Sequence, residues 1–283
     1  MVTFSRNDAD FFVPDGTPPD QALARTTHLG IGAHQDDLEI FSFSGIAECY
    51  EAGGGTYTGV VVTDGAGSPK TGGARGRSPE DMVADRRMEQ RRAAEIGRYS
   101  CVIQLGHPSA TVKDPDRLEV VDDLAAILRT ARPRVLYLHN PADKHDTHVA
   151  VLLRSLSALR SLPQAERPER VYGCEVWRGL DWLADEDKQP LDAGIHPELA
   201  APLLQVFVSQ IGAGKRYDLA ALGRRQANAT FFEPRASDPS GALVFAMDLT
   251  PLVRDDTLSI ETLTRHHLEK FQQDVLTRLA RFS

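Results

Sequence analysis

The sequence is poor in cysteine, and this shortage excludes two kinds of stabilising site. Its three cysteines, Cys49, Cys101 and Cys174, lie far apart in 283 residues and form no CxxC pair. Neither a disulfide framework nor a thiolate zinc site is therefore encoded. We expect three small, buried thiols in a reducing compartment.

The sequence also lacks an excess of positive charge and any long apolar run. Lys and Arg total 32 against 40 Asp and Glu, which gives a formal net charge of −8. This balance offers no basic surface for nucleic acid or an anionic membrane. No apolar run approaches the ~20 residues of a membrane span, and no secretory signal is visible. We therefore expect a cytoplasmic protein without a membrane span that binds no nucleic acid.

The composition is that of an ordinary globular protein, with 41% apolar and 25% charged residues. The order of these residues predicts alternating strands and helices. Strands are predicted at residues 27–33, 58–63, 101–105, 135–138 and 171–177. Helices are predicted at residues 40–51, 78–96, 118–129 and 146–162, the first ended by Gly53–Gly55 and the second begun by Ser78 and Pro79. The pattern predicts a Rossmann-like α/β fold, with a mostly parallel sheet and helices on both faces.

The ends of the chain are less regular than its middle. Residues 1–26 contain three prolines and are expected to form an extended N-terminal arm. Residues 27–283 are expected to be one domain, with a core at 27–180 and a C-terminal α/β elaboration at 181–283. In the elaboration we expect a long surface loop, two strands and a C-terminal helix, at 185–202, 203–209, 243–249 and 261–282 respectively.

Three polar loops follow predicted strands and should face one crevice, because ligands of such sheets bind beyond the carboxyl ends of the strands. They are residues 34–39, 64–78 and 139–148. The second is rich in glycine but matches no P-loop. A phosphate cradle, a mobile lid and a plain flexible loop all remain open for it.

The first of these loops contains a histidine and two adjacent carboxylates, His34, Asp36 and Asp37. Neighbouring carboxylates repel each other unless a cation or a proton holds them together. One aspartate could instead cap the following helix. That alternative would leave His34 and the second aspartate unexplained.

The third loop contains three of the nine histidines: His139, His145 and His148. His145 and His148 are three residues apart and share a face if the helix has begun. Histidine with carboxylate suits zinc, and a catalytic zinc keeps three protein ligands and one open position. The two loops together therefore predict a metal site.

Two short motifs resemble those of the PIG-L (LmbE-like) N-deacetylase family. Ala33-His34-Gln35-Asp36-Asp37 is similar to its Ala-His-Pro-Asp-Asp motif, and the segment from His145 to His148 is similar to its second motif, His-Pro-Asp-His. The resemblance implies one Zn²⁺ per chain, or another divalent ion, held by His34, Asp37 and His148. It also implies that Asp36 is the general base and that His145 polarises the developing oxyanion. Adjacency alone does not distinguish the roles of the two aspartates.

The motifs depart from the family pattern at two positions. Gln35 replaces a proline, which we expect to loosen the turn without displacing the ligands. Thr147 replaces an aspartate that would orient a histidine, so Asp143 or Asp146 is expected to supply that contact.

The resemblance implies a hydrolase that removes an N-acyl group, in the first instance acetyl, from an amino sugar such as an N-acetylglucosamine derivative. There are three alternatives: an amidase that acts on thiol-sugar or other small amide conjugates, a non-catalytic ligand-binding module, and a two-metal phosphatase. Candidates for substrate contacts are Arg86, His107 and Asp143. The alternative interpretation of His107 is a loop residue without a functional role. A homo-oligomer is compatible with the sequence.

Several aromatic and basic residues also suit a substrate. Trp177 and Trp182 could stack on a sugar or pack in the core. The basic residues near Tyr217 and at Arg224–Arg225 could bind an anion or lie on a solvated helix face.

Overall fold

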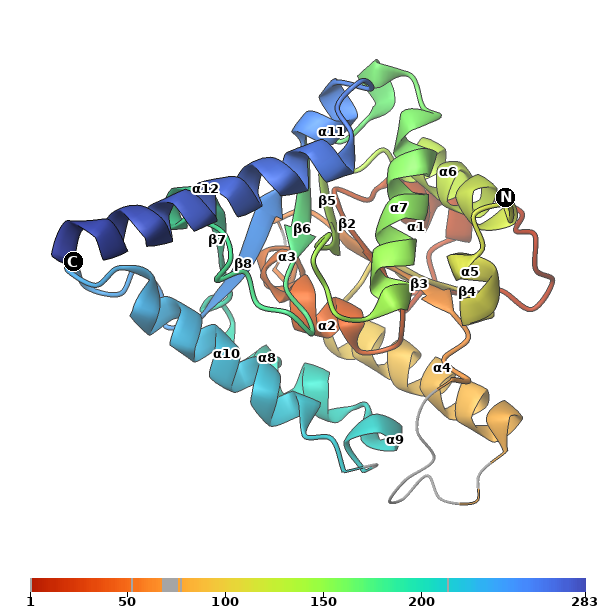
Figure 1. Ribbon diagram of the computed structural model, residues 1–283. Coiled ribbons are helices and arrows are strands. Elements are labelled where there is room, and N and C mark those ends of the chain that lie inside the picture. Colours follow the sequence, from red (N-terminus) through yellow and green to blue (C-terminus); the bar gives the residue numbers. More distant parts are fainter. Residues whose placement is uncertain (1, 52, 68–75, 77, 213) are drawn as a thin grey trace.

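The alternation of apolar and amphipathic segments produces an eight-stranded sheet with helices on both faces (Figure 1). The computed structural model describes residues 2–51, 53–67, 76, 78–212 and 214–283. The strands are β1 (Asp10–Phe12), β2 (His28–Gly32), β3 (Tyr57–Thr63), β4 (Cys101–His107), β5 (Val135–His139), β6 (Arg170–Cys174), β7 (Lys188–Asp192) and β8 (Leu243–Asp248).

The order of the strands across the sheet is β1-β4-β3-β2-β5-β6-β8-β7. The five strands from β4 to β6 are parallel, whereas β1 and β8 pair antiparallel with their inner neighbours and β7 pairs antiparallel with β8. The central order is that of a Rossmann fold, in which the chain reverses its direction of travel between β2 and β5. The predicted fold class is therefore confirmed, and the reversal marks the expected place of a ligand site.

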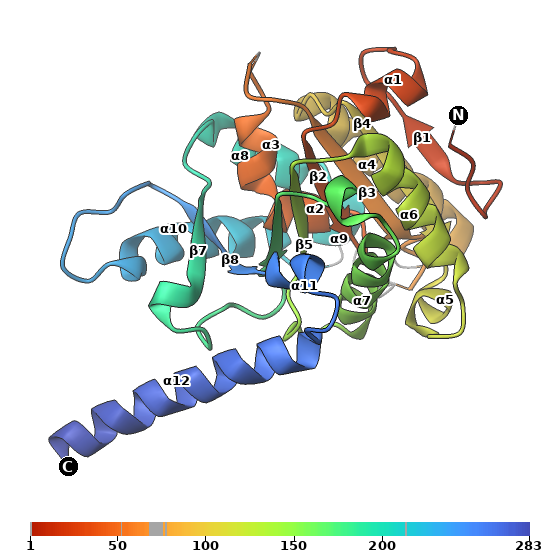
Figure 2. The same ribbon diagram turned by 90° about the horizontal axis from the view of Figure 1, so that it is seen from above.

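Helices cover the two faces of this sheet in separate groups (Figure 2). The α-helices are α1 (Pro19–Ala24), α2 (Asp37–Phe41), α3 (Phe43–Glu48), α4 (Pro79–Ile96), α5 (Ser109–Lys113), α6 (Glu119–Ala131), α7 (Asp146–Arg160), α8 (Pro197–Gln205), α9 (Val208–Ile211), α10 (Tyr217–Phe232), α11 (Pro251–Arg254) and α12 (Ile260–Phe282), with short 3-10 turns at Gln164–Glu166 and Asp185–Asp187. Apolar side chains of α6 and α7 pack on one face, and those of α2, α3, α4 and α8 pack on the other.

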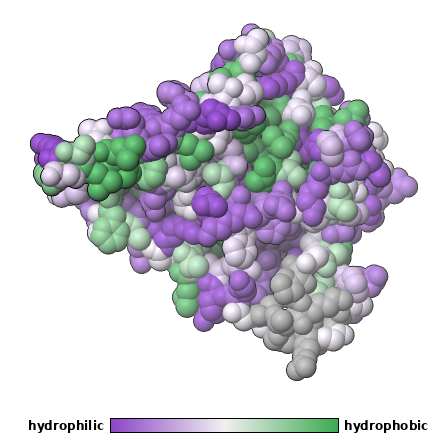
Figure 3. All heavy atoms as spheres, in the orientation of Figure 1, coloured by the Kyte–Doolittle hydropathy of each residue, from purple (hydrophilic) through white to green (hydrophobic). Residues whose placement is uncertain are grey.

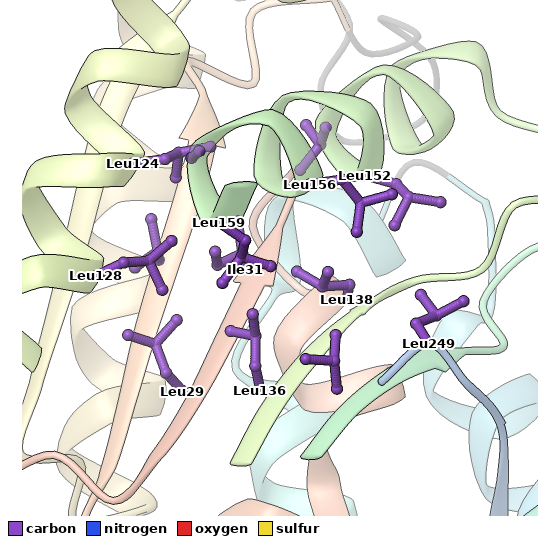
Figure 4. Close-up of a cluster of buried hydrophobic side chains, with 14 of the residues drawn as sticks. Leu29, Ile31, Leu124, Leu128, Leu136, Leu138, Leu152, Leu156, Leu159 and Leu249 are labelled. Carbon is purple, nitrogen blue, oxygen red and sulfur yellow. The ribbon is translucent and has the colours of Figure 1, made fainter. Parts of the chain in front are cut away.

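The two faces of β2 differ in the size of their side chains. Leu29 and Ile31 point toward α6 and α7, where they join a cluster of buried leucines (Figure 4). The opposite face has only glycine at positions 30 and 32. A Cβ atom on Gly30 would lie 2.2 Å from the Tyr57 hydroxyl oxygen, and one on Gly32 would lie 3.0 Å from the Asp37 Cβ. The missing side chains thus let α2 approach the sheet closely and place Asp37 at the end of β2.

The helix predicted at residues 40–51 is divided into α2 and α3. The break is at Ser42, whose hydroxyl donates to the Leu38 carbonyl oxygen at 2.7 Å and also bonds the Tyr57 hydroxyl. Such a bond from a serine to the preceding turn bends a helix. The predicted glycine cap is also wrong, because α3 ends at Glu48 and its capping residue is Cys49 in a right-handed conformation.

Both ends of the chain contain more regular structure than predicted. Residues 1–26 are not simply an extended arm, since β1 joins the edge of the sheet and α1 follows it. Residues 185–202 are not a loop but contain β7 and most of α8. Residues 203–209, predicted as a strand, instead form the end of α8, a two-residue connection at Val206 and Phe207, and the start of α9. The strand at 243–249 and the C-terminal helix are confirmed as β8 and α12.

Candidate metal and active site

The predicted metal ligands meet at the carboxyl ends of β2 and β5. His34 and Asp37 follow β2, and His148 lies in the first turn of α7, which follows β5. β2 and β5 are adjacent parallel strands, and the chain reverses direction between them. This is the location at which ligands bind in open α/β sheets.

The turn after β2 holds the two adjacent aspartates in different ways. Asp36 has a φ of 93°, in the left-handed region that non-glycine residues rarely occupy, and its side chain makes no capping bond. Asp37 instead accepts the His34 backbone N–H at 2.7 Å. Helix capping therefore does not account for Asp36. Backbone strain of this kind is found where surrounding structure enforces a functional position.

The side chains of His34, Asp37 and His148 converge on one point. Nδ1 of His34 lies 3.2 Å from Nε2 of His148. One oxygen of the Asp37 carboxylate lies 3.4 Å from that His34 nitrogen, and the other lies 3.4 Å from that His148 nitrogen. Ligands ~2.0–2.1 Å from a tetrahedral zinc are separated by ~3.3–3.4 Å. The two histidine nitrogens and the Asp37 carboxylate thus lie at separations close to those that a zinc ion requires, with a different Asp37 oxygen facing each histidine.

His139 is a buried neighbour of this group, and the sequence motifs assigned it no role of its own. Its ring stacks on that of His148, with centroids 3.9 Å apart, and its Nε2 lies 3.4 Å from an Asp37 oxygen. By distance alone, Asp37, His139 and His148 form a second possible metal-binding set, and His34, His145 and His148 a third. However, Nε2 of His139 accepts the Ala33 backbone N–H at 3.0 Å. Its lone pair is therefore engaged, which makes His139 a support for the turn after β2.

His145 lies beside the proposed ligands, and its contacts define which ring nitrogen accepts a hydrogen bond and which donates one. It precedes α7, where its Nδ1 accepts the Thr147 backbone N–H at 3.3 Å and so caps the helix. Burial, together with the charge of nearby His34, lowers the pKa of His145. In the resulting neutral ring the proton is on Nε2, because Nδ1 is the acceptor. His145 is thereby set to donate a hydrogen bond from Nε2.

Asp143 links the loop after β5 to the His148 ring. One of its oxygens accepts the His145 backbone N–H at 3.0 Å; the other accepts the Trp177 backbone N–H at 3.1 Å and approaches His148 Nδ1 at 3.5 Å. Burial opposes its charged form, but the hydrogen bond and charge of His148 outweigh burial and lower the Asp143 pKa. Asp143 is therefore placed to orient His148, which is the contact expected from Asp143 or Asp146.

The pKa values of the two adjacent aspartates shift in opposite directions, because the charges of two histidines act on Asp37. Burial, reinforced by the charge of Asp37, raises the Asp36 pKa well above its usual value. Burial also opposes ionisation of Asp37, but the charges of His148 and His139 prevail and hold its pKa well below the usual range. Burial lowers the pKa of His148 to about 4. Asp37 is thus an anion beside a neutral histidine, the forms in which both bind metal.

Arg86 reaches the site from α4. It is buried, its Nη1 donates to the Gly65 carbonyl oxygen at 2.6 Å, and its charge favours the ionised form of Asp36. Gly65, which has a φ of 74°, packs against both Arg86 and Gln35, and a Cβ there would lie 2.5 Å from the Gln35 amide oxygen. Arg86 is therefore fixed next to the base candidate.

Gln35 does not loosen the turn as expected. Its side chain is buried and donates to the Gln104 amide oxygen at 3.2 Å, and its carbonyl oxygen accepts a hydrogen bond from Gln210 of α9. The side-chain amide supplies the donor to Gln104, whereas the acceptor for Gln210 is the backbone carbonyl of Gln35. The turn is held by side-chain bonds instead of by a proline ring.

His107 lies apart from the other predicted site residues. It is the last residue of β4 and not a loop residue, and its ring is buried. Its Nε2 lies 2.9 Å from an oxygen of Asp123 in α6, and Ser5 donates to the same carboxylate. This contact ties His107 to α6, and the Ser5 bonds tie the same carboxylate to the N-terminal segment. Among the described contacts, none joins it to the histidine cluster.

An aromatic rim borders His145. The Trp177 ring, partly exposed, lies 6.4 Å from the His145 ring and 5.8 Å from the Tyr217 ring, with the Lys215 ammonium 5.1 Å from its centre. Burial and the charge of Asp36 raise the Tyr217 pKa. Sequence reasoning missed Tyr217, which enters the site from α10, far along the chain. Trp177 lies at the rim instead of in the core.

Two further predictions concern segments next to the site. Arg225 is not on a solvated helix face: it is buried, donates to the Glu39 and Ile40 carbonyl oxygens, and lies over the Phe43 ring at 4.3 Å. The glycine-rich loop predicted at 64–78 lies largely outside the described residues. Within the part of the chain that the structure describes, no helix is both long and apolar enough to cross a membrane.

Fold and site together define a Rossmann-like α/β protein with a histidine–carboxylate pocket where the sheet reverses its order. The model of the PIG-L family, described as GlcNAc-PI de-N-acetylase, matches residues 29–158. An uncharacterised deacetylase of Escherichia coli K12, YaiS, is 30% identical over 144 residues, which are 48% of this chain and 69% of that protein. The chain belongs to the PIG-L family, which confirms the resemblance found in the sequence motifs.

Solved structures share the fold at low sequence identity. N,N'-diacetylchitobiose deacetylase from Pyrococcus horikoshii has a TM-score of 0.63 and 17% identity, over 83% of this chain and 88% of that one. GalB, the 4-carboxy-2-hydroxymuconate hydratase from Pseudomonas putida KT2440, has a TM-score of 0.59 and 18% identity, over 79% and 96%. The A40926 pseudoaglycone deacetylase Dbv21 has a TM-score of 0.55 and 16% identity, over 80% and 98%. Since the same fold is found in a hydratase, the reaction must be argued from the site.

Proposed function

We propose that this protein is a zinc-dependent hydrolase that removes an acetyl group from the nitrogen of a small amino-sugar derivative. The convergence of His34, Asp37 and His148 at ligand spacing is the observation that supports this proposal most strongly. Its membership of a de-N-acetylase family and the deacetylase name of its Escherichia coli relative agree with it.

We assign the metal to His34, Asp37 and His148 for two reasons. Among the described contacts, no backbone N–H engages Nδ1 of His34 or Nε2 of His148, and Asp37 keeps a second oxygen beside the one that accepts the His34 N–H. His139 and His145 each engage one nitrogen with a backbone N–H, from Ala33 and Thr147. When bound, zinc supplies Lewis-acid chemistry that acidifies water and polarises a carbonyl group.

Asp36 is the proposed general base and acid. It is buried next to Asp37, and its raised pKa brings it closer to neutral pH, where proton transfer in both directions is most efficient. Asp36 takes a proton from the attacking water as the new C–O bond forms. It then passes that proton to the nitrogen as the C–N bond breaks, so that the products are acetate and a free amine.

His145 is the proposed oxyanion donor. Its Nδ1 is engaged by Thr147, so the N–H on Nε2 is available for the amide oxygen as negative charge develops there. The Trp177 and Tyr217 rings beside it offer an apolar surface for the sugar.

Cytoplasmic location and the absence of nucleic-acid binding remain predictions from the acidic composition.

The test combines metal analysis with amine release from a panel of N-acetylated sugars, sugar conjugates and simple amides. We expect one zinc per chain, and we expect Asp36→Asn to lower kcat by ~10²–10⁴-fold with the zinc retained. Asp122→Asn on α6, away from the pocket, is the matched control. Full activity of Asp36→Asn would refute the mechanism. Two metals per chain would favour the phosphatase, no metal would favour a binding module, and turnover of non-sugar amides alone would favour the amidase.

A further inference from the structure

The C-terminal helix α12 extends away from the body of the protein (Figure 1, Figure 2). It contains 23 residues, from Ile260 to Phe282, and none of them is buried. Its middle is held by His267 and Lys270, which pair with Asp187 at 3.2 Å and 2.8 Å. Beyond Phe271, the described contacts of α12 are all within the helix.

One face of α12 is apolar from its first turn to its last. Residues Ile260, Thr264, Leu268, Phe271, Val275, Leu279 and Phe282 recur at intervals of three or four and so form a single stripe. The first turns of the stripe face α7. The last turns have no partner in the described chain, and the exposed fraction rises from 39% for Val275 to 60% for Leu279 and 83% for Phe282. Figure 3 shows apolar atoms gathered along this free end.

The stripe begins in a groove between α7 and α12. The groove has a volume of about 400 Å³ and is lined mainly by apolar residues, among them Val149 and Leu153 of α7 and Ile260 and Leu268 of α12. An isolated helix is marginally stable in water, and packing of its apolar face supplies most of its stability. Among the described residues, nothing packs on the apolar face of the free half of α12, so that face is open to a partner.

We propose that the apolar stripe of α12 pairs with the same stripe of a second copy, antiparallel and about a twofold axis near Val275. This register places Phe271 opposite Leu279 of the second copy and Leu268 opposite Phe282 of the second copy. Because Leu268 lines the groove, the exposed Phe282 ring of each copy lies at the groove of the other. A twofold interface is closed, so the assembly stops at the dimer.

The charges beside the stripe are self-complementary in this arrangement. Asp274 and Arg278 form an ion pair of 3.1 Å within the helix, along one edge of the stripe. In this antiparallel register, Arg278 of one copy lies two residues, ~3 Å along the helix axis, from the level of Asp274 of the other, so its long side chain can reach that carboxylate and the two ion pairs can join into one alternating cluster. A parallel pair in register would instead place each residue beside its own copy. The antiparallel order is therefore favoured.

The area of this contact is enough for a dimer that forms reversibly. The stretch from Leu268 to Phe282 is ~22 Å long, and with the Phe282 ring in the groove each copy buries roughly 500 Å². The total of about 1,000 Å² is at the lower limit of specific interfaces, so the dimer should dissociate on dilution.

The first test measures molar mass by sedimentation equilibrium over a range of concentrations. Wild type should approach twice the chain mass of 31.1 kDa at high concentration. The double substitution Val275→Glu with Leu279→Glu should remain monomeric, with at least a 10-fold weaker association and unchanged helical content by circular dichroism. Phe231→Glu is the matched control, because Phe231 is 82% exposed but lies on α10. A monomeric wild type, or a dimer that survives the double substitution, would overturn the proposal.

The second test addresses the antiparallel register. All three native cysteines are buried, so a new surface cysteine reports its own contacts. Val275→Cys should form a disulfide-linked dimer under mild oxidation, whereas Thr277→Cys, on the opposite face, should not. The single reversals Asp274→Arg and Arg278→Asp should each weaken association, and the two together should restore it. Equal cross-linking at 275 and 277, or no recovery in the double reversal, would contradict the register.

Discussion

Asp143 offers the sharpest test of how the protein positions the proposed metal ligand His148. Its two oxygens bond the backbone N–H groups of His145 and Trp177, and one of them also approaches Nδ1 of His148 at 3.5 Å. We predict that Asp143→Asn weakens zinc binding without unfolding the protein. The substitution conserves shape and one oxygen, and removes the negative charge and one acceptor.

The magnitude follows from counting donors and acceptors. If the oxygen of the introduced amide keeps the bond from the His145 N–H, the NH₂ group of that amide faces the Trp177 N–H and the His148 ring, donor against donor. A buried donor left without an acceptor costs ~1–3 kcal/mol. Loss of a carboxylate that orients a metal-binding histidine typically weakens metal affinity by ~10–100-fold, which is a similar free energy. We therefore expect the zinc dissociation constant to rise ~10–100-fold.

The assay is a competition titration of the metal-free protein with zinc and a chelator of known affinity. Asp146→Asn is the matched control, because Asp146 is three residues along the same segment and none of its described contacts reaches His148. A chemical unfolding curve of the metal-free protein separates loss of affinity from loss of stability. Unchanged zinc affinity in Asp143→Asn, or an equal loss in Asp146→Asn, would refute the assignment of Asp143 as the residue that orients His148.

Two further predictions concern the framework and the rim of the site. Gly30→Ala should destabilise the protein by ~1–3 kcal/mol in urea unfolding, because its methyl group would lie 2.2 Å from the Tyr57 oxygen. Gly223→Ala, in α10 with open space around it, should instead gain ~0.5–1 kcal/mol, and equal effects at both positions would contradict the steric argument. Trp177→Ala should raise KM for an amino-sugar substrate ~2- to 10-fold with kcat nearly unchanged, the range expected for one aromatic contact. Trp182→Phe serves as its control, and a pure kcat effect at Trp177 would argue against a binding surface there.

The parts of the fold that sequence reasoning predicted correctly are those with strong local signals. β3 is buried along its whole length and contains three consecutive valines, and Ser78 caps α4 by accepting the Asp81 N–H at 3.0 Å. The alternation of such elements leads to a parallel sheet. That sheet then brings the loop after β2 and the loop after β5 to one edge, so the neighbourhood of the site was predictable.

The parts that failed are those in which long-range packing decides the structure. Residues 203–209 contain Val206, Phe207 and Val208, which are typical of strands. Yet Leu203 and Phe207, one helical turn apart, are both buried in the cluster that α8 forms with the sheet. Packing against that face outweighs a local preference worth no more than ~1 kcal/mol. Tyr217 was missed for a related reason, since α10 approaches the carboxylates only in three dimensions.

The roles of the histidines depend on a kind of information that sequence spacing does not contain. His139 and His148 are both fully buried, stack on each other and lie within 3.4 Å of Asp37, so residue type, burial and distance do not separate them. They differ in whether a backbone N–H engages the nitrogen that faces Asp37. The Ala33 N–H engages the nitrogen of His139 that faces Asp37, whereas the corresponding nitrogen of His148 faces His34 and Asp37. Because an imidazole nitrogen has one lone pair, the backbone of the turn after β2 determines which of two equivalent side chains is available to bind a metal ion.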